Sequence, residues 1–97
     1  MMEAVKTDRR MLKFPLFHVL EPVFDDVVTL HAQPNLGIAH VGMQDGFVTL
    51  WALCDIYQPK TLRRFRLVAT GQVMEPVGHY LGTVQERSYV WHVFEVF

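Results

Sequence analysis

Apolar and polar residues alternate with a period of two through most of this chain, which is the pattern of β-strands. Residues 79–97 show it most clearly, with an aromatic or β-branched residue at almost every second position. No stretch carries the 3.6-residue period of an amphipathic helix. The pattern predicts strands at Leu12–Val19, Asp26–Ala32, Leu36–Gln44, Phe47–Asp55, Leu62–Thr70, His79–Gln85 and Tyr89–Val96.

Turn residues separate these segments and indicate how they connect. Asp45-Gly46 predicts a tight hairpin, because glycine supplies the positive φ that such turns need. A second hairpin is expected across residues 86–88. Pro15 lacks the amide required in a central strand, so the first strand should be an edge strand or a bulged one. About seven short strands with hairpin turns predict an all-β fold, either an antiparallel sandwich or a partly open barrel.

The faces of the strands indicate which residues form the core. Phe47–Asp55 is apolar on both faces, which predicts a central strand covered twice. Strict alternation places Ile38 on the face opposite Val41. The expected core or intersubunit residues are Val48, Leu50, Trp51, Leu53, Phe65, Leu67, Tyr80, Trp91 and Phe94.

The length of 97 residues predicts one domain. Residues 1–11 are charged and lack a strand period, so we expect a flexible N-terminal extension followed by a β domain at 12–97. Half of the residues are apolar, which is more than one small core absorbs. This surplus predicts a homo-oligomer, with Trp51, Trp91 and Phe94 as candidate interface residues.

The net charge of −1, with acids and bases mixed along the chain, gives no reason to expect nucleic acid or an anionic membrane as partner. Cys54 is the single cysteine, which excludes an internal disulfide and a thiolate zinc cluster and predicts a small buried side chain. The polar start and the lack of a long apolar run predict neither a signal peptide nor a membrane span. A cytoplasmic location is expected.

The five histidines have no recognised metal-binding spacing. His31 and His40 could face each other across a strand pair, but a third ligand is lacking, so we expect no metal and no cofactor. His92 and Glu95 fall on opposite faces of a regular strand and make a poor catalytic pair. The only serine is in a predicted turn and Asp25-Asp26 point apart, so no catalytic residue is predicted.

The densest basic group is Lys60, Arg63, Arg64 and Arg66. Arg64 and Arg66 project from one face of a strand, an arrangement suited to phosphate or carboxylate. We take Arg63, Arg64 and Arg66 as candidate anion contacts. The alternative is a strand face salt-bridged to acids such as Asp55 or Glu86. Trp91 is either a ligand platform or a core or interface aromatic.

Several short motifs resemble a family of small, functionally uncharacterised proteins of tailed bacteriophages and prophages. The motifs are Lys13-Phe14-Pro15-Leu16, Leu50-Trp51-Ala52-Leu53-Cys54-Asp55, Tyr80-Leu81-Gly82-Thr83 and Val90-Trp91-His92-Val93-Phe94-Glu95. The resemblance covers about residues 12–95 and departs from the pattern at Cys54, where valine is expected, and at Ala69-Thr70-Gly71, where Gly-Thr-Gly is expected. It implies a phage origin and a shared small β fold, and it brings no site residues.

These observations predict a phage accessory protein that acts by binding in the cytoplasm of an infected bacterium. It would inhibit a host or defence protein, or sequester a small anionic ligand such as a nucleotide, as a homo-oligomer. The first alternative is a structural or assembly component of the virion. The second is an uncharacterised enzyme.

Overall fold

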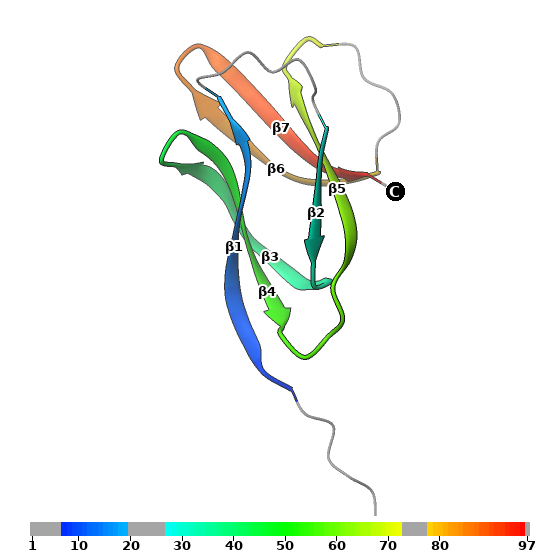
Figure 1. Cartoon of the computed structure of the whole chain (residues 1–97). Coiled ribbons are helices and arrows are strands. Elements are labelled where there is room, and N and C mark those ends of the chain that lie inside the picture. The colour runs from blue at the N-terminus through cyan, green and yellow to red at the C-terminus, as the bar shows by residue number, and fades with distance from the viewer. Residues whose placement is uncertain (1–6, 20–26, 73–77, 97) are drawn as a thin grey trace, which may run out of the picture.

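The computed structural model describes residues 7–19, 27–72 and 78–96, and within these ranges the chain forms strands and no helix (Figure 1). The strands make two antiparallel sheets, β1-β4-β3 and β2-β5-β7-β6. The predicted all-β fold is confirmed. The strands are β1 (Arg9–His18), β2 (Val27–Ala32), β3 (Asn35–Gln44), β4 (Phe47–Asp55), β5 (Thr61–Ala69), β6 (Gly78–Glu86) and β7 (Tyr89–Val96).

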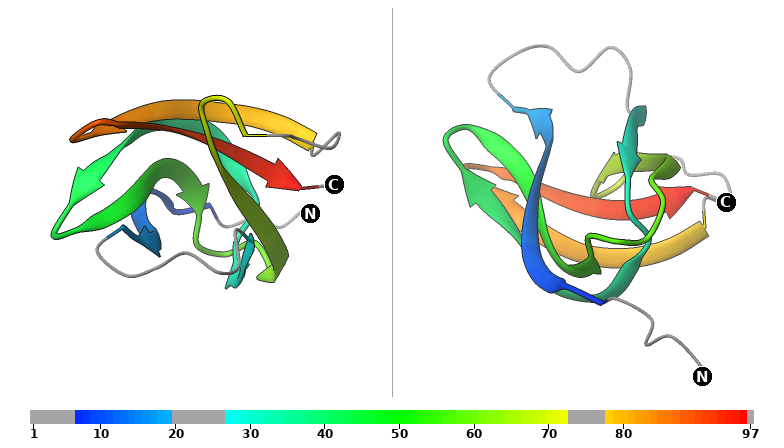
Figure 2. Two further views of the ribbon diagram at one scale, coloured as in Figure 1. Left: turned by 90° about the horizontal axis from the view of Figure 1, so that it is seen from above. Right: turned by 60° about the horizontal axis from the view of Figure 1, so that its bottom comes forward.

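The two sheets pack face to face, and the four-stranded sheet bends around the core (Figure 2). Its edge strand β6 lies against β3, the edge strand of the three-stranded sheet. Gly82 permits this approach, because a Cβ atom there would lie 2.8 Å from Cγ2 of Val41. No ladder joins the two sheets among the described residues, so the fold is a sandwich and not a closed barrel. The bend leaves the outer face of the four-stranded sheet convex.

The core lies between the sheets and draws on six of the seven strands, with β2 adding partly buried Val28 and Leu30. The predicted core residues Val48, Leu50, Phe65 and Leu67 are buried there. Trp91 packs against this cluster, whereas Trp51, Leu53, Tyr80 and Phe94 lie on outward faces. The buried cluster is Leu16, Phe17, Val41, Val48, Leu50, Phe65, Leu67, Val84 and Val93.

β1 is an edge strand with a bulge between Pro15 and Phe17, as the proline predicts. The strand begins at Arg9 and not at Leu12. Arg9–Met11, which we assigned to the N-terminal extension, pair with β4 at Asp55, Cys54 and Leu53. Asp8, also in the expected flexible segment, is held to β4: its amide donates to Asp55 Oδ1 at 3.1 Å, and its carbonyl accepts from the Ile56 amide at 2.9 Å. Residues 1–6 lie outside the described residues.

β4 is the central strand of its sheet, as predicted. Its inward residues Val48, Leu50, Ala52 and Cys54 are all fully buried. The expectation that both faces are covered is wrong for the outward face, where Trp51 and Leu53 remain half-buried. The reason is that no described strand forms a second layer over the outward face of this three-stranded sheet.

β3 departs from the regular alternation predicted for it. A bulge between Ile38 and His40 shifts the register, so Ile38 pairs with Ala52 and Val41 pairs with Leu50. Ile38 and Val41 therefore face the same core, and their predicted placement on opposite faces is wrong. The following turn is as expected, with positive φ at both Asp45 (52°) and Gly46 (81°).

Candidate functional site

The three arginines predicted to contact an anion lie on opposite faces of β5. Arg64 is exposed and Arg66 is half-buried on the outer face of the four-stranded sheet, whereas Arg63 points into the sandwich and is 6% exposed. The alternation of side chains along the strand causes this separation, because Arg63 shares its parity with Phe65 and Leu67. The three residues therefore do not form one cluster.

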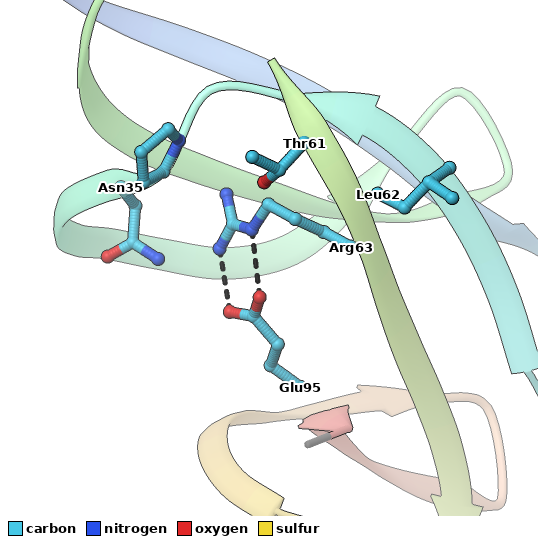
Figure 3. Close-up of a pocket in the computed structure, with 6 residues that line it drawn as sticks. Asn35, Thr61, Leu62, Arg63 and Glu95 are labelled. Atoms are coloured by element: carbon cyan, nitrogen blue, oxygen red, sulfur yellow. Dashed lines mark hydrogen bonds and ion pairs between the residues drawn. The ribbon is translucent and has the colours of Figure 1, made fainter. Parts of the chain in front are cut away.

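Arg63 is already held by protein groups. Its Nε and Nη2 atoms donate to the two carboxylate oxygens of Glu95 at 2.8 and 2.6 Å (Figure 3). Its Nη1 atom donates to the carbonyl of Gln33 at 2.9 Å. Its guanidinium also lies 5.2 Å from the ring centroid of Phe65. The pair of opposite charges is neutral, so an anion would have to displace Glu95 to bind here. The sequence suggested Asp55 or Glu86 as acids beside the strand face of Arg64 and Arg66; Arg63 lies on the opposite face and pairs with Glu95.

A small open pocket surrounds this ion pair, with a volume of about 250 Å³. Pro34 of the β2–β3 connection and Asn35, the first residue of β3, border it, and the start of β5 closes another side (Figure 3). The hydroxyl of Thr61, the amide of Asn35 and the ion pair give it a polar, uncharged character. The pocket is lined by Pro34, Asn35, Thr61, Leu62, Arg63 and Glu95.

The outer face of the four-stranded sheet, called the basic face below, has a different composition. Its central row joins three strands, because Arg66 of β5 is the register partner of Phe94 on β7, and Phe94 is the partner of Tyr80 on β6. Arg64 lies two positions before Arg66 on β5, and Leu62 lies two positions before Arg64, near the start of the strand. No carboxylate occurs among the described residues of this face, which are Val27, Thr29, His31, Leu62, Arg64, Arg66, Val68, Gly78, Tyr80, Thr83, Gln85, Val90, His92, Phe94 and Val96.

Aromatic rings occupy the middle of the basic face. The centroids of Tyr80 and Phe94 are 5.6 Å apart with an angle of 59° between the planes, which is a tilted ring contact. Tyr80 is 58% exposed, so most of its ring remains open to solvent. The sequence placed Tyr80 in the core or an interface and did not connect it with the arginines.

A chain of hydrogen bonds holds these side chains in place. Tyr80 Oη contacts the Thr83 hydroxyl, which lies 2.9 Å from Nδ1 of His92. Nε2 of His92 lies 2.7 Å from the Thr70 hydroxyl, which also contacts the Val90 carbonyl at 3.4 Å. One direction satisfies every group: Tyr80 donates to Thr83, Thr83 to Nδ1, Nε2–H to Thr70, and Thr70 to the carbonyl. The ring of His92 is therefore bonded at both nitrogens.

The three candidate interface residues lie on three different surfaces. Trp51 is on the outward face of the three-stranded sheet, where its ring lies 5.5 Å from His40. Trp91 faces the interior of the sandwich and stacks on Tyr89 at 5.3 Å. Phe94 belongs to the basic face. One flat interface cannot bury all three side chains.

The histidines do not meet in pairs. His31 is on β2 of the four-stranded sheet and His40 is on β3 of the three-stranded sheet, so the expected pairing across neighbouring strands is wrong. Within the ranges that the structure describes, no three histidine, cysteine or acidic side chains are placed to share a metal ion. His92 and Glu95 lie on opposite faces of β7, as their parity predicts. Asp25-Asp26 lies outside the described residues.

Comparison with known families adds one match. A family described as a domain of unknown function (DUF7352) matches residues 8–97. The chain belongs to this family. The matched region of this DUF7352 domain starts one residue before β1 and includes all seven strands. No curated protein and no solved structure shows significant similarity to the chain. In the described part of the domain, no helix is long and apolar enough to cross a membrane.

Proposed function

We propose that this domain acts by binding an anionic partner through the basic face, and not by catalysis. One observation carries the proposal. Arg64 and Arg66 share a face on which no described residue is acidic, although the whole chain has a net charge of −1. Among the described residues, the fold thus places these two arginines apart from the acidic side chains, and neighbouring basic side chains attract partners of negative charge.

The basic face suits binding better than group transfer. The nearest approach to a catalytic pair is Thr83 and His92, whose hydroxyl and imidazole lie 2.9 Å apart. Activation of a hydroxyl needs a base that a third group orients, commonly a carboxylate. The second nitrogen of His92 contacts the Thr70 hydroxyl instead. Arg63 is not part of the proposed binding surface, because its ion pair with Glu95 holds it inside the sandwich.

The motif resemblance supplies a biological setting for this activity. It favours a small phage accessory protein in the cytoplasm of an infected bacterium, where it would inhibit a host or defence protein or capture an anionic ligand. Capture of an anionic ligand requires a surface that recognises negative charge, and inhibition of a host protein through the basic face would require an acidic surface on that protein. Arg64 and Arg66 are the residues that would carry the recognition, since guanidinium groups bind phosphate and carboxylate with defined geometry.

Chromatography on immobilised heparin, a generic polyanion, tests the proposal. We expect the protein to be retained at low ionic strength and the Arg64→Glu/Arg66→Glu variant to elute at clearly lower salt. The matched control is Arg9→Glu/Lys13→Glu, which changes net charge equally on the three-stranded sheet. An equal loss of retention in both variants would show that net charge, and not the basic face, governs binding. Arg64→Glu alone, at an exposed position, repeats the test if the double variant is unstable.

A second candidate function rests on the other outward face. Trp51, Leu53 and Met11 form an apolar group on the three-stranded sheet, and Met11 is 54% exposed. Such a group favours a protein contact, either with a second copy of the chain or with a neighbouring virion component. Mass spectrometry of purified virions separates this structural role from an intracellular one. Native mass spectrometry of the wild type and Trp51→Lys tests the homo-oligomer, which the substitution should dissociate.

A further inference from the structure

The outer edge of β1 presents backbone groups that no described strand uses. β1, the blue strand of Figure 1, has a ladder with β4 and with no other described strand. The Ile56 amide donates to the Asp8 carbonyl at 2.9 Å. The register with β4 is regular from this point to the bulge. In an antiparallel ladder with this phase, the amides and carbonyls of Arg9, Met11 and Lys13 point away from β4.

Pro15 supports this phase. It belongs to the same alternating set as Lys13, so the amide that proline lacks is one that the β1–β4 ladder does not need. The bulge between Pro15 and Phe17 then ends the regular edge. The edge therefore offers a short row of hydrogen-bonding groups that matches one short extended segment.

We propose that the edge of β1 from Arg9 to Pro15 binds an extended acidic segment of another protein, which adds to the three-stranded sheet as a further strand. In strand addition, main-chain hydrogen bonds supply the affinity and the neighbouring side chains supply the selectivity. The inference concerns a different surface from the basic face and does not depend on anion binding there. It adjoins the apolar group of Met11, Trp51 and Leu53 and gives that side of the molecule a defined partner.

The side chains along this edge determine the chemistry of the partner. Those of Arg9, Met11 and Lys13 share the outward face of the sheet and all are exposed, Met11 by 54%. Arg9 and Lys13 make no ion pair with a described residue. Arg10 points to the other face, where its charge is paired with Asp8 at 2.8 Å. The edge thus presents a positive, an apolar and a positive side chain, with about 13 Å between the two charged positions.

A complementary segment carries an acidic, an apolar and an acidic residue at alternate positions. Opposite charges directly across a strand pair are stabilising, and like charges are destabilising. Arg9 and Lys13 therefore favour acidic strands and oppose basic ones, as charged residues on exposed edges do. Asp55, the register partner of Arg9, does not remove this preference. Its Oδ1 accepts from the amides of Asp8 and Tyr57 at 3.1 and 3.0 Å, and it is only 4% exposed.

A second copy of the chain fits the same edge less well. In the two-fold register centred on Met11, Arg9 of each copy would lie directly opposite Lys13 of the other. In the register centred on Leu12, Lys13 would lie opposite Met11, and Arg9 opposite Pro15. The first arrangement places like charges together, and the second leaves both cations without an acidic partner. An acidic strand from another protein matches both charges.

Amide hydrogen exchange followed by NMR tests the phase and the partner together. The probe is the peptide Thr-Glu-Val-Leu-Thr-Glu-Thr with blocked ends, whose leucine would lie opposite Met11 and whose glutamates would lie opposite Lys13 and Arg9. In the protein alone, we expect the amides of Arg9, Met11 and Lys13 to exchange faster than the Leu12 amide, which points toward β4. Saturating peptide should slow the three outward amides by about tenfold or more.

Modified peptides separate strand addition from simple charge attraction. N-methylation of the central leucine removes the amide that would donate to the Met11 carbonyl, and it should abolish binding. N-methylation of the preceding valine, whose amide would point away from β1, should retain binding. Replacement of both glutamates by glutamine should weaken binding roughly 2- to 30-fold. The Arg9→Glu/Lys13→Glu variant should reverse the preference and favour a peptide with lysines in place of the glutamates.

Three outcomes would overturn the inference. The first is unchanged exchange of the outward amides at millimolar peptide. The second is an equal effect of the two N-methylated peptides. The third is slow exchange of these amides in the protein alone, which would show that the edge is already covered, by a second copy if native mass spectrometry gives a dimer. The peptide series uses the unaltered protein, so it decides the question even if the variant is unstable.

The result is independent of the test of the proposed function. Heparin has no polypeptide backbone and cannot add a strand, so its retention through Arg64 and Arg66 is a separate measurement. Peptide binding without heparin retention would contradict only the proposed function. Heparin retention without peptide binding would contradict only this inference.

Discussion

Arg63 and Glu95 join β5 to β7 through a two-point ion pair on the inner side of the four-stranded sheet. Residues that are 32 positions apart in the chain thus meet beside the buried ring of Phe65. The third bond of Arg63, to the Gln33 carbonyl, adds the connection between the two sheets. A single side chain therefore links three segments that contribute to different parts of the sandwich.

Removal of the Glu95 charge should destabilise the fold. Glu95→Gln leaves the Arg63 guanidinium buried without its counter-charge, a change that costs 3–5 kcal/mol in a fully buried pair. Because Glu95 is 22% exposed, we expect a loss of about 2–3 kcal/mol in the free energy of unfolding. Urea unfolding measures it. The control is Glu86→Gln, which weakens the exposed contact of Glu86 with Arg87 and should cost under about 1 kcal/mol.

The close approach of β6 to β3 makes Gly82 intolerant of any side chain. In Gly82→Ala the new Cβ would lie 2.8 Å from Cγ2 and 2.9 Å from Cβ of Val41, so one strand must move. Such overpacking costs about 1–3 kcal/mol. Gly37→Ala is the matched control, since nothing lies within 4 Å of the Cβ built there. Equal stabilities of the two variants in thermal unfolding would show that the strands do not approach as described.

Cys54 should be unreactive in the folded protein. The side chain is fully buried on β4, and burial raises the pKa of the Cys54 thiol, while the charge of Arg63 acts in the opposite direction. A thiol-specific reagent such as 5,5′-dithiobis(2-nitrobenzoate) should label the native protein far more slowly than the urea-unfolded chain. Fast labelling of the native state would contradict the burial.

The same thiol predicts a pH dependence of stability. Because the folded pKa lies above the unfolded value of about 8.5, the unfolded chain loses its proton first as the pH rises. The thiol therefore does not lower the free energy of unfolding below that pH. Above it, the free energy of unfolding falls by at most about 1.4 kcal/mol per pH unit. Urea unfolding between pH 7 and 10 should show a shallower decline in Cys54→Ala. Parallel curves for the two proteins would contradict this assignment.

The sequence pattern predicts most of the strand positions because local period and turn chemistry determine them. The Asp45-Gly46 hairpin and the edge position of β1 follow from the conformational needs of glycine and proline. The bulge at Ile38–His40 does not follow, since an inserted residue leaves no mark on composition. It reverses the face of every later residue of β3 relative to strict alternation.

The candidate site depends on long-range pairing that the pattern does not contain. Alternation correctly separates Arg64 and Arg66 from Phe65, and also His92 from Glu95. The pairing of β5 with β7, and of β7 with β6, brings Arg66, Phe94 and Tyr80 into one row. Strand order is a property of the assembled sheet. For the same reason β2 and β3, neighbours in sequence, lie in different sheets and keep His31 away from His40.

The order β2-β5-β7-β6 also constrains the biosynthesis of the protein. β7 follows the other described strands in the sequence but is an interior strand of its sheet, and its neighbours β5 and β6 have no ladder with each other. On the ribosome, the four-stranded sheet cannot close until Val96 has left the exit tunnel, several seconds after β2 has emerged at typical rates of translation. During that interval the apolar residues of β5 and β6 are exposed to chaperones and to other nascent chains.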